Sequence, residues 1–292
     1  MRVTNKLLID NFLRNLNYNL RRMKEAQYKL SSGHQIEVAS DDPVGASMIM
    51  KLKSDLADLN QYKKNIEDAR SWLEYTETAL INVGNALGRL REIVIYGAND
   101  TLSNSDRYAL AEEVKELKDH VIQEANASYA GRYIFGGYKT DNPPYDSSAV
   151  YNGDNGEIKY EVSPGNRLRV NLTGDEVFNS PYNLFQVIDD IYNNLMSGDT
   201  SALSQNRLSE LDECIDNILR CRAQIGAKVK RIEDAMKAYE ADEINLTKLL
   251  AQSEDADLAQ VVMDLTNQEN VYRAALATGA RIIQPSLADF LR

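Results

Sequence analysis

Apolar residues recur at heptad spacing through most of this 292-residue sequence, a pattern that builds long helices with one buried face. The first such segment spans residues 6–30. We call its repeating positions the N-terminal seam: Ile9, Leu13, Leu16, Leu20, Met23, Gln27 and Leu30. A basic amphipathic helix on a membrane surface has a related pattern, but the strict alternation of four- and three-residue steps favours a partner helix. The chain holds only 15 Gly and 6 Pro, so few residues interrupt its helices.

A matching C-terminal seam lies near the end of the sequence, at Leu258, Val261, Leu265, Gln268, Tyr272, Ala275 and Ile282. Residues 1–30 carry seven Lys and Arg against two Asp and Glu, whereas residues 253–292 carry three against six. Opposite charge on the two ends predicts that they meet. Gln27 and Gln268 interrupt the apolar seams, and we expect them to help set register because buried polar residues specify pairing.

Two inner segments repeat the heptad pattern on a larger scale. Residues 44–97 predict a helix about 80 Å long, and residues 211–250 match it in period, so we expect the two to pack antiparallel. A further helix over about 104–128 should fold back on the first. The character changes at Gly131: four of the six Pro fall between 131 and 181, and short strands are predicted at 150–151, 158–162 and 168–172.

These patterns predict a mainly α fold: a long antiparallel helical rod with coiled-coil-forming terminal helices and a small antiparallel β insert. The predicted domains are nested. Residues 1–40 and 253–292 form a terminal coiled-coil assembly domain, residues 41–130 and 182–252 form the helical rod, and residues 131–181 form an outer β insert. Because the helical patterns stop and resume at points that must lie close together, we expect the rod to fold without the insert.

Composition excludes several classes of function. A net charge of −11 argues against nucleic-acid binding, since phosphates would be repelled, and no apolar run is long enough to insert into a membrane. The two cysteines, Cys214 and Cys221, are seven residues apart on a predicted helix, about 10 Å along its axis, and are interpreted as buried apolar residues. We find no catalytic constellation, no metal-ligand spacing and no cofactor motif. The sequence therefore predicts a protein of assembly and not an enzyme.

The junction between the first two helices contains two strong local signals. Ser31-Ser32-Gly33 predicts a helix end, because Gly adopts the left-handed cap conformation at little cost. Asp42-Pro43 predicts a helix start, where a carboxylate caps free N–H groups and Pro has none to lose. We call this stretch the elbow. Its marked residues are Ser31, Ser32, Gly33, Ile36, Ala39, Asp41, Asp42, Pro43 and Gly45.

The elbow residues together resemble the N-terminal signature of bacterial flagellins and their hook-associated relatives. The chain departs from the signature at His34, where the family usually has Lys or Arg. The stretch from Asp255 to Leu291 also resembles this family. Residues 131–138 with Thr140 and Pro144, residues 151–154 and the ending 285–291 resemble its hook-associated branch, and filament flagellins lack them.

The resemblance implies a structural subunit of the extracellular bacterial flagellum, exported through the flagellar channel without a cleaved signal. It implies a ring of subunits, self-associated through their ends, between the hook-side junction protein and the first flagellins, and an export chaperone as a further partner. The two alternatives are a filament-forming flagellin and, from another class, a carbohydrate-binding or enzymatic β insert. We also expect the terminal segments, about 1–38 and 255–292, to be disordered in the free subunit and helical after assembly.

Overall fold

The computed structural model describes residues 2–36, 38–99 and 102–283, with side chains described between Leu7 and Ala280. The helices are α1 (Arg2–Ser32), α2 (Pro43–Gly97), α3 (Asn104–Ala125), α4 (Gly174–Phe178), α5 (Leu184–Ser197), α6 (Thr200–Ala202), a π-helical turn η1 (Leu203–Arg207), α7 (Leu208–Glu254) and α8 (Leu258–Ile283). The strands are β1 (Ser128–Tyr129), β2 (Arg132–Tyr133), β3 (Lys159–Ser163) and β4 (Asn166–Arg169). The predicted mainly α fold with small antiparallel sheets is confirmed.

The chain divides into two compact units. Unit 1 comprises Met1–Asp58 and Ala241–Arg292, and unit 2 comprises Leu59–Glu240. Both ends of the sequence therefore belong to one unit, as nested helices require. The finer three-part division proposed from the sequence stays a prediction.

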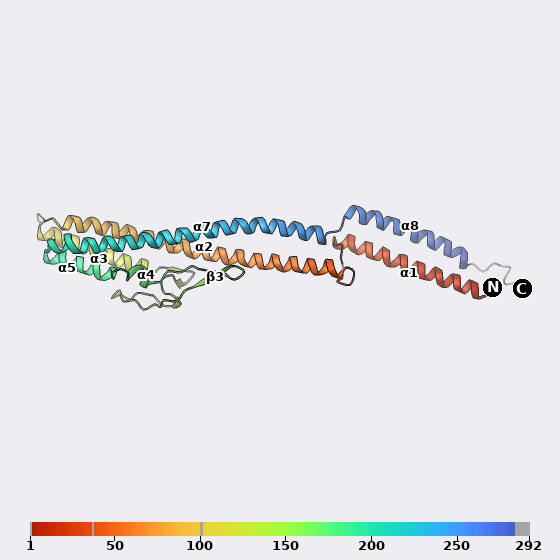
Figure 1. The fold of residues 1–292 in the computed structure, drawn as a ribbon, viewed down its shortest axis with the longest axis horizontal. Helices are drawn as coiled ribbons and strands as arrows, with labels where there is room; N and C mark the ends of the chain where they lie inside the picture. Colours follow the sequence, from red (N-terminus) through yellow and green to blue (C-terminus); the bar gives the residue numbers. More distant parts are fainter. Residues whose placement is uncertain (1, 37, 100–101, 284–292) are drawn as a thin grey trace. The chain divides into compact units, whose positions relative to one another are not determined.

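Unit 2 is built on an antiparallel pairing of α2 with α7 (Figure 1). The rings of Tyr62 and Tyr239 stack with centroids 6.3 Å apart. Further along α2, Arg91 Nε donates to Asp212 Oδ1 over 2.6 Å. A step of 29 residues forward along α2 is thus matched by 27 residues back along α7, as an antiparallel pairing requires.

The core of unit 2 explains why these two segments are helical. Every seventh residue of α2 is fully or almost fully buried, and so is every seventh residue of α7, because heptad positions return to the same face of a helix. The buried residues of this series are Ile66, Leu73, Leu80, Leu87 and Val94 on α2, and Leu211, Ile218, Ile225 and Ile232 on α7. Truncation of such side chains typically costs about 2–5 kcal/mol.

The shorter helices α3 and α5 lie side by side and close the core at one end of unit 2. Ser103 caps α3 by accepting from the N–H of Asp106, and Asn183 caps α5 by accepting from the N–H of Gln186. Between the helices, Lys118 Nζ lies 2.6 Å from Asp189 Oδ1. The predicted helix over about 104–128 corresponds to α3 within a few residues.

The β insert holds two small sheets, β1–β2 and β3–β4, each an antiparallel pair. The predicted strand at 158–162 corresponds to β3, and Gly165, at φ +71°, makes the tight turn into β4. The predicted strand at 150–151 is reduced to an isolated bridge between Tyr145 and Tyr151. Its place is taken by an aromatic cluster, because Tyr145 contacts the rings of Tyr151, Phe178 and Phe185 at centroid distances of 4.9–5.5 Å.

The insert shares one continuous hydrophobic core with the helices of unit 2. Polar side chains from the long helices also satisfy its backbone: Asn65 Nδ2 donates to the carbonyl of Glu161 over 2.8 Å, and Tyr239 Oη to that of Val162 over 2.6 Å. The expectation that the rod folds without the insert stays a prediction, and the shared core argues against it. Removal of the insert would expose buried apolar surface of α2 and α7 to water.

Asn217 of α7 is the most connected of these side chains. Its Nδ2 lies 3.0, 3.1 and 2.7 Å from the carbonyl oxygens of Glu176, Val177 and Ser180, at the end of α4. We predict that Asn217→Ala lowers the free energy of unfolding of unit 2 by about 1–3 kcal/mol, because carbonyls in a buried setting lose their donor. Asn193→Ala, at an exposed position of α5, is the matched control. Equal urea midpoints for the two variants would contradict the prediction.

Candidate assembly interface

Helices α1 and α8 of unit 1 pack against each other as an antiparallel hairpin (Figure 1). Near the start of α1, the ring of Phe12 lies directly against Gly279 of α8, where a Cβ would clash with the ring. At the other end, the turn after α1 lies against the turn before α8. The two ends of the sequence therefore meet, as their opposite charges predicted.

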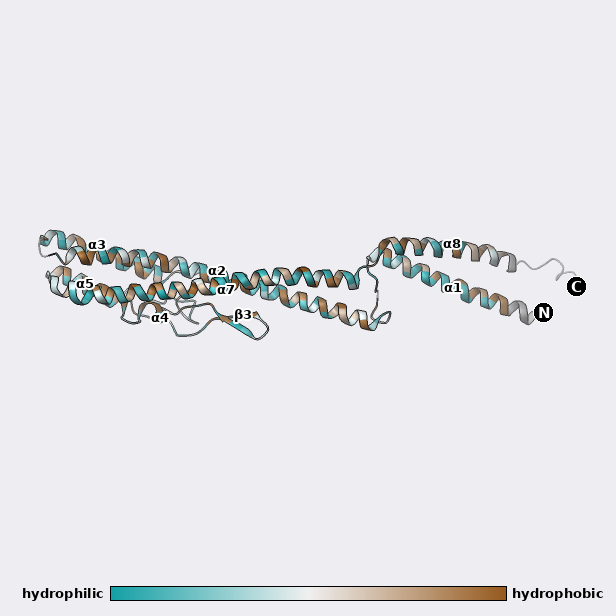
Figure 2. Cartoon of the chain, turned by 45° about the horizontal axis from the view of Figure 1, so that its top comes forward, coloured by the Kyte–Doolittle hydropathy of each residue, from teal (hydrophilic) through white to brown (hydrophobic). Residues whose placement is uncertain are grey.

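One face of each helix is turned inward in this hairpin. On α8 the inward positions follow the C-terminal seam: Val261 is buried, and Leu265, Gln268, Tyr272 and Ala275 are half-buried. On α1 the half-buried positions between residues 7 and 28 are Ile9, Phe12, Leu16, Asn19, Met23 and Ala26. Both helices thus present a stripe with alternating three- and four-residue steps, the geometry of a coiled coil. Figure 2 shows apolar and polar residues alternating along both helices.

The structure places the predicted interface residues in two groups. Half-buried or buried are Ile9, Leu16, Met23, Val261, Leu265, Gln268, Tyr272 and Ala275, while Leu13, Leu20, Gln27, Leu30 and Leu258 are exposed. The side chain of Ile282 lies outside the described residues, as does the ending 285–291. Sequence reasoning missed Phe12, Asn19 and Ala26. The available signal was Phe12 itself, a large apolar residue three positions after Ile9.

The exposed residues give the hairpin an apolar side. On α1, Leu13 and Leu20 each follow an inward residue by one position, and on α8, Val262 and Leu276 do the same. One residue turns an α-helix by about 100°, and in antiparallel neighbours equal turns lead to the same side of the pair. These four residues and Leu258 are 43–50% exposed.

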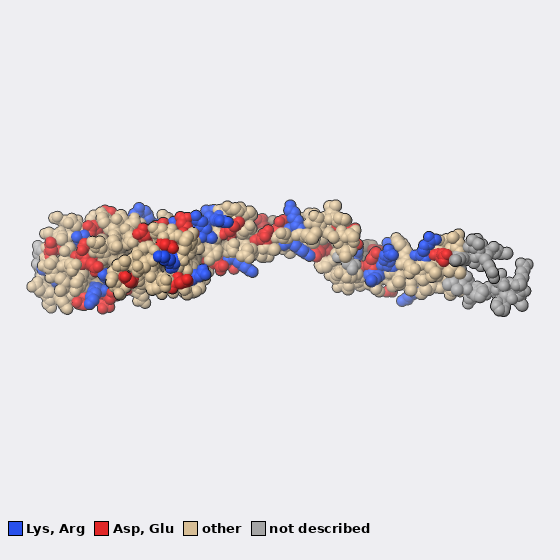
Figure 3. All heavy atoms as spheres, turned by 90° about the horizontal axis from the view of Figure 1, so that it is seen from below, with Lys and Arg blue, Asp and Glu red and all other residues tan. Residues whose placement is uncertain are grey.

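The opposite side of the hairpin is mixed. Arg22 and Lys29 of α1 and Gln260 and Asp264 of α8 line a shallow groove there. Leu8, Tyr18 and Val271, each one position before an inward residue, are exposed on the same side. Basic and acidic side chains are both visible on these helices in Figure 3.

The elbow is fastened to the turn between α7 and α8 by two backbone hydrogen bonds. The N–H of Ala256 donates to the carbonyl of Gly33 over 2.8 Å, and the N–H of Gln35 donates to that of Glu254 over 2.7 Å. Gly33 ends α1 at φ +76°, in the left-handed region where a side chain is disfavoured. The predicted role of Gly33 as a helix stop follows from this geometry.

The signature residues after Gly33 begin the next helix. Asp42 Oδ1 accepts from the N–H groups of Val44 and Gly45 over 3.1 and 3.0 Å, so it caps α2, with Pro43 at the first position. A Cβ at Gly45 would lie 2.7 Å from Ile36 Cδ1. Glycine therefore lets Ile36 pack on the first turn of α2.

The remaining elbow residues support the loop. Asp41 Oδ2 accepts from the N–H of Val38 over 3.2 Å. Ser31 Oγ donates to the carbonyl of Tyr28, and Ser32 Oγ accepts from the N–H of His34. Ala39 is exposed.

A single carboxylate, Glu254, ties the elbow to both long helices. Its Oε1 lies 2.6 Å from Lys53 Nζ of α2 and 3.5 Å from His34 Nδ1. Glu254 is itself the last residue of α7 and is largely shielded from solvent, with 15% of its side chain exposed. His34 thus lies beside a carboxylate, where the family usually has a fixed positive charge.

Comparison with known proteins agrees with this architecture. The model of the bacterial flagellin N-terminal helical region matches residues 3–140. Flagellar hook-associated protein 3 of Escherichia coli is 25% identical over 94% of this chain and 95% of its own length, and that of Salmonella typhimurium is 24% identical over 95% and 96%. The chain is thus similar to bacterial flagellins in its N-terminal region and to hook-associated protein 3 over nearly its whole length. Its similarity to hook-associated protein 3 runs through both terminal helices and the insert.

A solved structure shows the same fold. The flagellar junction protein FlgL from Legionella pneumophila aligns with a TM-score of 0.61 and 21% identity, covering 72% of this chain and 100% of that one. The family likeness predicted from the elbow is therefore supported by sequence and by fold.

Among the described residues there is no group of three His, Cys, Asp or Glu that could hold a metal ion, and no helix in the described part of the chain could cross a membrane. Cys214 and Cys221 are free and buried, and burial raises the pKa of the Cys214 thiol to about 11. A thiol with a raised pKa is a poor nucleophile at neutral pH.

The contact of Phe12 with Gly279 gives a direct test of the hairpin. Gly279→Val places a branched side chain against the Phe12 ring and should force α1 and α8 apart, at a cost of about 1–3 kcal/mol for overpacking. Ala280→Val adds the same side chain at the next, exposed position and should be neutral. We expect only Ala280→Val to restore swimming in cells that lack the native gene. Equal motility with both variants, secreted at equal levels, would contradict the hairpin.

Proposed function

We propose that this chain is a structural subunit of the extracellular bacterial flagellum, an adaptor between the hook-side junction protein and the flagellin filament. The observation that carries the proposal is the α1–α8 hairpin, which brings both ends of the chain into one coiled coil with an uncovered apolar side. The near full-length similarity to flagellar hook-associated protein 3 supports the same role. The net charge of −11 and the helical core are also compatible with a structural subunit.

We further propose that the subunits associate in a ring through the apolar side of the hairpin. Leu13, Leu20 and Val262 are too exposed to be explained by the packing of one chain. Neighbouring copies could cover them and so gain the free energy of burial, about 25 cal/mol per Å² of apolar surface. Flagellin and the hook-side junction protein would be the axial partners, and an export chaperone would keep these faces covered before secretion.

The alternative within the family is a filament-forming flagellin. Electron microscopy of labelled protein on the flagellum separates the two, because an adaptor occupies one band at the end of the hook, whereas a flagellin extends along the filament. Long filaments grown from the purified chain alone would overturn the adaptor role. We propose no enzymatic activity, since the relatives are flagellar components by name.

The apolar side also gives a mutational test. Leu20→Glu should leave the stability of the free chain within about 0.5 kcal/mol, because Leu20 is exposed, yet it should prevent assembly by placing a charge in an apolar contact. Tyr18 is exposed on the outward face of the same helix. Tyr18→Glu should therefore assemble more efficiently than Leu20→Glu. Chemical melts and sedimentation of assembled complexes measure the two effects. Assembly of Leu20→Glu at the normal level would rule out this contact.

A further inference from the structure

The stretch at residues 131–138, which the sequence singled out and the adaptor role leaves unexplained, ends in an exposed tyrosine. Tyr138 lies in a loop, outside the strands, and 66% of it is exposed. Its ring packs closely on Gly156, where a Cβ would clash with ring carbons. A glycine at this position therefore leaves room for the ring.

Tyr138 is also held in place at both ends. Its N–H donates to Asp154 Oδ1 over 2.6 Å, and its Oη donates to the carbonyl of Glu157 over 3.1 Å. Gly137, at φ +69°, allows the close approach of Asp154, where a side chain would clash. The ring is thus preorganised, so a ligand that stacks on it loses little side-chain entropy.

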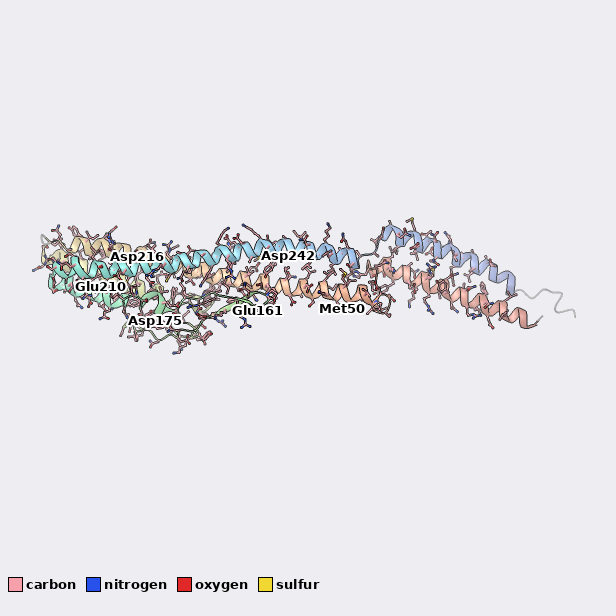
Figure 4. All side chains as sticks on the ribbon, viewed as in Figure 1. Met50, Glu161, Asp175, Glu210, Asp216 and Asp242 are labelled. Carbon is pink, nitrogen blue, oxygen red and sulfur yellow. The ribbon has the colours of Figure 1, made fainter. Side chains whose placement is uncertain are left out.

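A shallow groove beside this ring has three cations among its seven lining residues. Arg132, Lys159 and Arg167 line it together with Tyr138, Thr140, Glu157 and Ile158. The one acid, Glu157, is already paired with Lys159 at 2.6 Å and with Arg169 at 3.3 Å, and these cations lower its pKa. Arg167 approaches Glu161 only loosely, at 3.7 Å. Figure 4 labels Glu161, on the strand β3 that also carries Lys159.

We propose that this groove binds an acidic polysaccharide, with a sugar ring stacked on Tyr138 and its carboxylates on Arg132, Lys159 and Arg167. A pyranose ring has a face of C–H groups that packs on an aromatic ring, while its hydroxyl and carboxylate groups point outward to the rim. The groove is open, so it suits a segment of an extended chain. The proposal does not depend on the adaptor role, because the groove lies in the β insert of unit 2 and the assembly hairpin lies in unit 1.

Two other partners share part of this chemistry. An acidic peptide would satisfy the cations but has no ring to match the flat platform. A nucleic acid has rings and negative charge, but its charge lies on backbone phosphates, away from the base that would stack on Tyr138. In a polysaccharide of uronic acids the sugar ring that stacks carries the carboxylate itself, so it fits both the ring and the cations beside it.

The experiment is calorimetric titration of the full chain with oligogalacturonate of defined length. We expect saturable binding that weakens as salt is added, and a loss of affinity of about tenfold or more, equivalent to about 1.4 kcal/mol, in Tyr138→Ala. Tyr138→Phe keeps the ring and should retain most of the affinity. Tyr182→Ala, an exposed tyrosine that does not line the groove, is the matched control and should bind as the native chain does.

Parallel titrations with malto-oligosaccharide, polyglutamate and single-stranded DNA test the ligand class. Weak or no binding to all three supports the proposal, and circular dichroism verifies that each variant is folded. No binding of oligogalacturonate, equal affinity in Tyr138→Ala, or equal affinity for polyglutamate or DNA would each overturn it. None of these results bears on where the chain lies in the flagellum, so the adaptor role is tested separately.

Discussion

Incomplete burial of the terminal helices is the constraint on which the account depends. In a two-helix hairpin each helix can bury only one stripe, and α1 and α8 are apolar over a wider arc than that stripe. The inward residues cover each other, whereas Leu13, Leu20 and Val262 stay in contact with water. Unit 2 solves the same problem internally, because α3, α5 and the β insert cover the faces of α2 and α7 that their pairing leaves open. The described residues of unit 1 include no such cover.

The elbow holds the ends of α1, α2 and α8 in a defined arrangement. It ends α1 at Gly33, starts α2 at Asp42 and is joined to the turn before α8 by two backbone hydrogen bonds. Exposed ion pairs contribute little, but Glu254 is shielded and bridges Lys53 and His34. The family signature in this stretch is therefore a set of caps and close contacts that aligns both ends of the chain for pairing.

Features that depend on a local sequence pattern could be predicted from the sequence alone. The heptads of α2 and α7, the Gly33 stop and the Asp42 cap depend on neighbours within a few residues. The inward face of α1 could not be fully predicted, since Phe12 is preferred to Leu13 only because Gly279 leaves room for its ring. The shared core of the insert was missed for a similar reason: Asn217 reaches carbonyls some forty positions away in sequence. Contacts of this kind depend on the packed structure and have no periodic signal.

Hydrogen exchange tests the central claim, that neighbouring copies complete the burial of the terminal helices. In the free chain, amides of 13–23 and 261–275 should exchange within seconds, while those of 80–90 and 225–232, in the core of unit 2, stay protected. In assembled junctions all four stretches should exchange slowly. Strong protection of α1 and α8 in a dilute monomer would contradict the account, because the hairpin would then be stable without a partner.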